Sequence, residues 1–205
     1  MPTRRLFLAS AGALVALPAL GQERANPMPE DLRRALERDP TAPVLGNPQG
    51  NITLTEFFDY NCPHCRTMLP MIQQLVSSDP QLRVVYREWP IFGEGSEFAA
   101  RASLASLSTG NYWRFHAGLL GMRDRAQEAS VMRIARQVGL DEARLRRDME
   151  GEPVERHISM SHLMAEHMGL VGTPTFICGD EAAFGALTLA ELRELVARGR
   201  QTMGV

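Results

Sequence analysis

Lysine is absent from this sequence: all 22 of its basic residues are arginine, against 24 acidic residues in a chain of 205. Catalysis by a lysine nucleophile or through a lysine Schiff base is therefore excluded. The formal net charge is -2, and without Arg4 and Arg5 the count is 20 arginines against 24 acids, or -4. Because the chain has no excess of cations to neutralise phosphates, nucleic acid is not an expected partner.

Cysteine is scarce as well. The three cysteines, Cys62, Cys65 and Cys178, are an odd number, and 44% of the residues are hydrophobic. A chain of this length and composition can build a core without disulfide staples. A structural disulfide framework is therefore not the expected use of these cysteines.

Apolar runs are short. The run at residues 6–20 falls below the roughly 20 residues that a membrane-spanning helix requires. It follows Arg4 and Arg5 and ends in small residues, so residues 1–21 are predicted to be a cleaved export signal. The paired arginines resemble a twin-arginine signal, and the general secretory route stays open. The mature protein is expected in the periplasm, where a thiol pair can persist as a disulfide.

The hydrophobic pattern predicts an α/β protein. Residues 22–42 are interpreted as a solvated N-terminal extension, with a docking or oligomer-forming helix over 30–38 as the alternative. Residues 43–96 read as strand, helix and strand, with the helix over 63–76. Residues 97–168 have alanine and leucine at helical spacing and predict four or five helices. Residues 169–205 predict one or two strands and a closing helix from Thr188 to Gly199.

Two of the cysteines are placed for redox chemistry. In "EFFDYNCPHCRTM", Cys62 falls where strand gives way to helix, and Pro63 suits the first helical position. Unpaired N–H groups and the helix dipole favour a thiolate there, and Cys65 is one turn away. Thiolates of such pairs have pKa values from about 7 down to about 3.5, against about 8.5 for a free cysteine. The lower value corresponds to about 7 kcal/mol of thiolate stabilisation, and the dipole supplies at most about 2 kcal/mol. The rest must come from hydrogen bonds to the sulfur and from a nearby positive charge, for which His64 is the candidate, and the pair is expected to donate disulfides.

Two alternatives for the pair stay open. A zinc site needs four ligands, and only Cys178 remains as a thiol. His157, His162 and His167 recur every five residues, which places them on different sides of a helix. A structural disulfide closing so short a loop would stabilise the fold only weakly.

The strings "EFFDYNCPHC" and "VGTPTF", separated by a helical insertion, resemble the DsbA-like thiol-disulfide oxidoreductases of the thioredoxin superfamily. The similarity runs from about Pro43 to Gly199. It implies a thioredoxin-like fold with an inserted helical domain and no cofactor beyond the Cys62–Cys65 disulfide. Cys62 would be the exposed nucleophile and Cys65 the buried resolving thiol. Thr173-Pro174 would form the cis-proline loop that lines the substrate groove.

The resemblance also gives Glu56 a role. This residue lies six positions before Cys62, on the apolar face of the predicted strand, and matches the buried acid of the family. Burial should raise its pKa and suit it to move the proton of Cys65 through water. A purely structural buried glutamate is the alternative.

The direction of exchange is left open. Pro63-His64 favours an oxidase, whereas Thr173 before the proline is typical of isomerase and reductase relatives and of the branch linked to copper tolerance. Expected partners are exported cysteine-containing proteins, with a membrane partner resembling DsbB or a thiol-supplying reductase. Cys178 is interpreted as a small apolar residue of a buried strand, with a third redox thiol or a copper ligand as alternatives.

Overall fold

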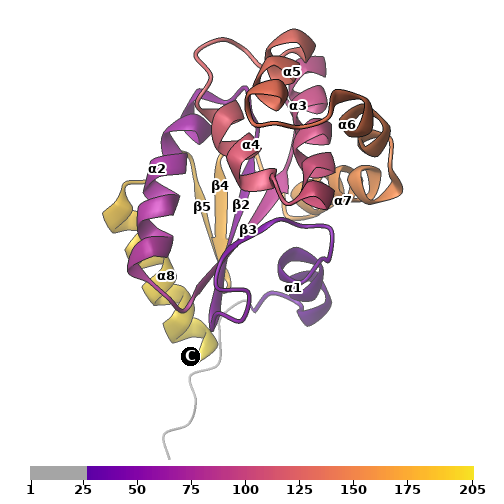
Figure 1. The fold of residues 1–205 in the computed structure, drawn as a ribbon. Coiled ribbons are helices and arrows are strands. Elements are labelled where there is room, and N and C mark those ends of the chain that lie inside the picture. Colours follow the sequence, from indigo (N-terminus) through magenta and orange to yellow (C-terminus); the bar gives the residue numbers. More distant parts are fainter. Residues whose placement is uncertain (1–26) are drawn as a thin grey trace, which may run out of the picture.

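The computed structural model describes residues 27–205, which form a five-stranded sheet with helices on both faces (Figure 1). The strand order is β1-β3-β2-β4-β5; β2 and β3 are parallel, and every other pair is antiparallel. The strands are β1 (Val44–Gly46), β2 (Ile52–Phe58), β3 (Leu82–Glu88), β4 (Thr175–Cys178) and β5 (Glu181–Phe184). The predicted export signal, residues 1–21, lies outside the described residues and stays a prediction.

Five helices in succession interrupt the sheet between β3 and β4. The helices are α1 (Glu30–Glu37), α2 (Pro63–Ser78), α3 (Glu94–Ala105), α4 (Tyr112–Leu120), α5 (Glu128–Gln137), α6 (Glu142–Met149), α7 (Glu152–His167) and α8 (Leu189–Met203), with a 3-10 turn at Ser106–Thr109. The predicted thioredoxin-like α/β fold with an inserted helical domain is confirmed. Among residues 27–205, no helix is long and apolar enough to cross a membrane.

Strand β2 is the centre of the sheet, and all seven of its residues are buried. Alternate side chains point to opposite faces of a strand. Leu54 and Phe58 join the main core, which includes side chains of α2 and α8, whereas Phe57 joins a second cluster with residues of α1 and α7. Glu56 shares the face of Leu54 and Phe58, so covering both faces of the sheet also removes this carboxyl group from water. The strand ends at Phe58.

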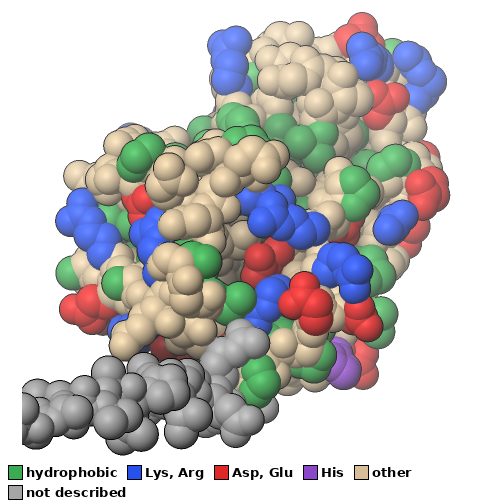
Figure 2. Space-filling model, turned by 90° about the horizontal axis from the view of Figure 1, so that it is seen from below, with side chains coloured by type: hydrophobic (Ala, Val, Ile, Leu, Met, Phe, Trp, Pro, Cys, Tyr) green, Lys and Arg blue, Asp and Glu red, His purple; other side chains and the backbone are tan. Residues whose placement is uncertain are grey.

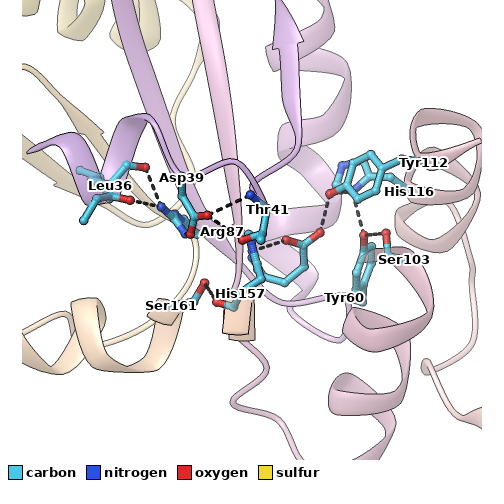
Figure 3. A network of polar contacts seen from close by, with 12 residues as sticks. Leu36, Asp39, Thr41, Tyr60, Arg87, Ser103, Tyr112, His116, His157 and Ser161 are labelled. Carbon is cyan, nitrogen blue, oxygen red and sulfur yellow. Dashed lines mark hydrogen bonds and ion pairs between the residues drawn. The ribbon is translucent and has the colours of Figure 1, made fainter. Parts of the chain in front are cut away.

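The interpretation of the N-terminal extension as solvated is wrong for α1. Leu36 is 1% exposed and packs in the second cluster with Phe57 and Trp89. The fully buried guanidinium group of Arg87 lies 2.8 Å from the carboxylate of Asp39 and also donates to backbone carbonyls at the end of α1 (Figure 3). The second face of the sheet needs an apolar cover there, and the short apolar stripe of α1 is enough to provide it.

The end of α8 also differs from the prediction. Thr188 caps the helix as predicted, and its hydroxyl accepts a hydrogen bond from the N–H of Glu191. The helix does not end at Gly199 but continues to Met203, followed by Gly204 with φ 71°. A Cβ atom on Gly199 would lie 2.5 Å from the Cys178 sulfur. Gly199 therefore allows close packing of α8 on β4, and Gly204 is the glycine that terminates the helix.

Candidate redox site

Cys62 is the N-cap residue of α2, and Pro63 occupies the first turn, as the sequence predicted. The N–H of Cys62 donates to the carbonyl of Asp59 at 3.1 Å, which closes the turn between β2 and the helix. The thiol thus lies beside the unpaired N–H groups of the first turn of a sixteen-residue helix. In Figure 1 this site is at the end of the sheet opposite the C-terminus.

The pKa of Cys62 is lowered from 9.0 to about 5, mainly by a hydrogen bond from the thiol of Cys65. Burial opposes this shift; the side chain of Thr173 and the backbone N–H groups of Cys65 and His64 add to it. The ring of His64 is on the exposed surface, and this residue contributes through its backbone. The hydrogen bonds to the sulfur that the sequence interpretation expected are thus present, and the charge effect of the His64 ring stays a prediction.

Cys65 has the opposite environment. Its side chain is 1% exposed, and burial, the hydrogen bond to Cys62 and the charge of Glu56 raise its pKa far above the ordinary value of 9.0. Cys62 is also only 2% exposed, so the expectation of an openly exposed nucleophile is wrong. The two thiols differ in their hydrogen bonds and charges, and an incoming sulfur must reach Cys62 across the surrounding side chains.

Thr173 and Pro174 lie against the nucleophile. Their peptide bond is cis, and the Cys62 thiol donates to the Thr173 carbonyl at 3.2 Å. A carbonyl can only accept, so this bond belongs to the protonated form of Cys62. The buried Thr173 hydroxyl has no hydrogen-bond partner among the described residues, and it is the group of this residue that can donate to the thiolate.

Glu56 lies behind the pair. It is 2% exposed, and its pKa is raised from 4.5 to about 8, first by burial and then by the charge of Cys62. Its own charge acts in turn on Cys65. At neutral pH the carboxyl group is therefore mostly protonated, beside a thiol that needs a proton whenever its disulfide opens.

The sequence matches the DSBA-like thioredoxin domain family over residues 53–197. The chain belongs to the DsbA-like family of thiol-disulfide oxidoreductases. It is similar to a thioredoxin-like oxidoreductase from Silicibacter pomeroyi DSS-3, with 51% identity and a TM-score of 0.81 over 82% of this chain and 98% of that one.

Other solved structures of DsbA-like proteins are more distant. The thiol-disulfide exchange protein alpha-DsbA2 from Wolbachia pipientis has 29% identity and a TM-score of 0.76, covering 82% of this chain and 91% of its own. A periplasmic thioredoxin-like protein from Salmonella enterica serovar Typhimurium has 28% identity and a TM-score of 0.77, covering 85% of this chain and 98% of its own.

The chain also matches part of a much longer protein. It is 26% identical, over 75% of its own length, to the Na(+)/H(+) antiporter NhaA 3 from Salinispora tropica, and the match spans 24% of the length of that antiporter.

Asp59 holds the loop that carries Cys62 in this DsbA-like protein, and the sequence did not reveal this residue. The carboxylate is 2% exposed and accepts four hydrogen bonds. One oxygen accepts from the N–H of Asn61 at 2.6 Å and the hydroxyl of Ser96 at 2.7 Å, and the other from the N–H groups of Ile91 at 2.7 Å and Phe92 at 3.1 Å. An aspartate directly after a buried strand and three residues before a helix cap was the available signal.

A buried polar network joins the sheet of this DsbA-like fold to the inserted helices (Figure 3). Glu88, at the end of β3, accepts a hydrogen bond from the Tyr112 hydroxyl of α4 at 2.5 Å and lies 2.8 Å from Nε2 of His157 on α7. Beside it, the Tyr60 hydroxyl lies 2.9 Å from Nδ1 of His116, whose pKa burial lowers to about 3. The network holds α4 and α7 against the end of β3, next to the catalytic loop.

Cys178 lies away from the redox pair. It is fully buried, its pKa is raised to about 12 mainly by burial, and it pairs in register with Leu54. Thr175, next to the cis bond, pairs with Phe57, so Cys178 lies about 10 Å further along the sheet. In residues 27–205, no group of three or more histidine, cysteine or acidic side chains is placed to hold a metal ion.

Proposed function

We propose that this chain is an exported thiol:disulfide oxidoreductase that transfers disulfides to the cysteines of exported proteins. The observation that carries the proposal is the opposite shift of the two thiols, with the pKa of Cys62 at about 5 and that of Cys65 raised. The periplasmic relative from Salmonella and the predicted signal at residues 1–21 support export. The exchange protein from Wolbachia supports the reaction class.

The reaction starts from the Cys62–Cys65 disulfide. A substrate thiolate attacks the Cys62 sulfur, a mixed disulfide forms there, and the electron pair of the broken bond leaves on Cys65. A second substrate thiolate then attacks the substrate sulfur of the mixed disulfide, and Cys62 leaves as a thiolate. Two electrons have passed from the substrate to the pair, Cys65 has gained one proton, and the substrate holds a new disulfide.

Glu56 supplies that proton in this proposal. Cys65 is buried and its pKa is raised, so an unprotonated Cys65 is a poor leaving group. The carboxyl group of Glu56, with its pKa at about 8, holds a proton at neutral pH and gives it up directly or through water. The carboxylate then takes up a proton from water, because its raised pKa favours the protonated form at neutral pH.

The low pKa of Cys62 supports the oxidising direction. A stabilised thiolate favours the reduced pair and thereby makes the disulfide a stronger oxidant. Reoxidation then needs a partner, for which a membrane protein resembling DsbB is the family's example. The second candidate is a reductase or isomerase supplied with thiols by another protein, and Thr173 before the cis-proline favours it.

Equilibration of residues 22–205 with glutathione buffers tests the direction of exchange. We expect a reduction potential well above the value of about -270 mV known for thioredoxin, and a potential at or below that value would support the reductase candidate instead.

Two cysteine variants test the mechanism. Cys62→Ser should abolish oxidation of a reduced unfolded substrate, and Cys65→Ser should accumulate the mixed disulfide at Cys62. Cys178→Ala is the matched control, since it also removes a buried thiol, and it should retain turnover. Turnover in Cys62→Ser would reject the mechanism.

A further inference from the structure

The loop between α4 and α5 is tied directly to the loop that carries the nucleophile. The amide oxygen of Asn61, next to Cys62, accepts from the N–H of Ala126 at 2.7 Å, and its amide nitrogen donates to the Ala126 carbonyl at 3.1 Å. The guanidinium group of Arg66 donates to the carbonyls of Met122 at 2.6 Å and Asp124 at 2.9 Å. Residues 122–126 are therefore held beside the start of α2, as Figure 1 shows.

A second exposed segment is fixed to the same place. Asp59 holds the N–H groups of Ile91 and Phe92, whose side chains are 39% and 45% exposed. Gly95, at the start of α3, lets the backbone approach closely: a Cβ atom there would lie 2.1 Å from the Ala126 carbonyl. The two segments thus meet beside the nucleophile, and Arg125 bridges them with a 3.5 Å contact to the Phe92 carbonyl.

The loop presents cations that no carboxylate neutralises. Arg123 and Arg125 are exposed, and among residues 27–205 neither forms an ion pair with an acidic side chain. Asp124 between them lies 2.8 Å from Arg133 and is therefore already engaged. The opposite end of the molecule differs, because there arginine and acidic side chains alternate over the surface (Figure 2) and Arg200 pairs with Asp79.

We propose that Ile91, Phe92, Arg123 and Arg125 form a substrate rim, which binds cysteine segments carrying carboxylates beside an apolar residue. Because Cys62 is 2% exposed, a substrate has to cross neighbouring side chains to reach it. The chain as a whole is net negative and would repel an acidic segment, whereas the rim attracts it at the point of attack. This inference rests on the proposed function and names the substrate class.

Three reduced peptides with the same pair of cysteines and the same apolar residue test the rim. Their flanking positions carry glutamate, glutamine or arginine, and the second-order rate constant for oxidation by residues 22–205 is measured for each. At about 0.01 M ionic strength, where the Debye length is about 30 Å, we expect the acidic peptide to react about tenfold faster than the glutamine peptide. The preference should shrink to about threefold or less at about 0.15 M.

The double variant Arg123→Gln/Arg125→Gln should remove the preference, so that this variant oxidises the acidic and the glutamine peptide at the same rate. The control Arg147→Gln/Arg156→Gln removes the same charge from exposed positions on α6 and α7, and should keep the preference. Equal rates for the three peptides, or a preference that survives in the rim variant, would contradict the proposed substrate rim but not the proposed function. If no peptide is oxidised, both the rim and the proposed function are wrong.

Discussion

Thr173 and Cys62 are joined by a hydrogen bond of 3.2 Å, in which the cysteine thiol donates to the threonine carbonyl. The same threonine carries a buried hydroxyl that helps to lower the pKa of Cys62. One residue can therefore serve both protonation states, because its carbonyl accepts from the thiol and its hydroxyl is free to donate to the thiolate.

Removing that hydroxyl should raise the pKa of Cys62. A hydrogen bond to a charged group contributes about 1.5–3 kcal/mol, and one pKa unit corresponds to about 1.4 kcal/mol. Thr173→Val should therefore raise the pKa by about one unit or more and lower the reduction potential. The thiolate absorbance of the reduced protein, followed against pH, measures the pKa. Thr173→Ser keeps the hydroxyl and should titrate like wild type; a valine variant that also does so would remove Thr173 from the account of the low pKa.

Glu56 should make the stability of the protein depend on pH. Its pKa is raised from 4.5 to about 8 in the folded protein. Between these values the unfolded chain releases the Glu56 proton and the folded protein keeps it, so this group lowers the free energy of unfolding as pH rises, by about 1.4 kcal/mol per pH unit. Below pH 4.5 and above pH 8 its contribution is constant.

Glu56→Gln removes this titration, so the stability of the variant relative to wild type should rise steadily from about pH 5. Urea denaturation of both proteins in the oxidised form measures the difference. Oxidation removes the titration of Cys62 and Cys65 and also the charge of Cys62, so the rise should end below pH 8, with burial as the remaining cause of the raised pKa. Glu194→Gln changes a glutamate on the exposed face of α8 and serves as the control, with a constant difference from wild type. A constant difference for Glu56→Gln as well would mean that the buried carboxyl has an ordinary pKa.

Asp59 should matter for both stability and the catalytic loop. Asp59→Ala leaves the part-buried N–H groups of Ile91 and Phe92 and the buried hydroxyl of Ser96 without their acceptor, and each unsatisfied buried group costs about 1–3 kcal/mol. We expect a loss of about 3 kcal/mol or more in the free energy of unfolding, measured by urea denaturation. Asp59→Asn keeps one acceptor oxygen and should lose less. Equal, small losses for both variants would contradict the role of the carboxylate as the clamp between these segments.

The features that the sequence revealed depend on neighbours close along the chain. The strand–helix junction, the proline in the first helical turn and the spacing of Cys62 and Cys65 are local, and the periodicity of β2 and of the inserted helices is local too. Glu56 followed from its place on the apolar face of a strand. The pairing of Thr173 with Cys62 came from the resemblance to a family, since no local pattern links positions 111 residues apart.

The features that the sequence did not reveal depend on distant contacts. Whether α1 is solvated or buried is decided by the uncovered face of β2 and by Arg87, which reaches back to Asp39. Three of the four hydrogen bonds of Asp59 come from residues more than 30 positions away. Which hydrogen-bond donors surround the Cys62 sulfur was likewise not predictable, because the Thr173 side chain comes from a distant part of the chain.

The role of Gly199 also depends on a contact with a residue distant in sequence, and that contact provides a test of Cys178. Glycine inside a helix ordinarily costs about 1 kcal/mol relative to alanine, so Gly199→Ala would stabilise α8 if only the helix mattered. The new Cβ atom would instead meet the Cys178 sulfur at 2.5 Å. Overpacking of this kind costs about 1–3 kcal/mol. We therefore expect Gly199→Ala to lower the free energy of unfolding, as measured by urea denaturation.

Cys178→Ala should rescue that variant. With the sulfur removed, the nearest atoms to a Cβ at position 199 are carbons of residue 178 at 3.4 Å, which is ordinary contact. The double variant Gly199→Ala/Cys178→Ala should therefore be more stable than Gly199→Ala alone, although Cys178→Ala by itself leaves a small cavity and loses stability. All three proteins should keep the pKa and reduction potential of the Cys62–Cys65 pair, because Cys178 acts through packing. A shift of either quantity in Cys178→Ala would show instead that the third thiol takes part in the redox chemistry.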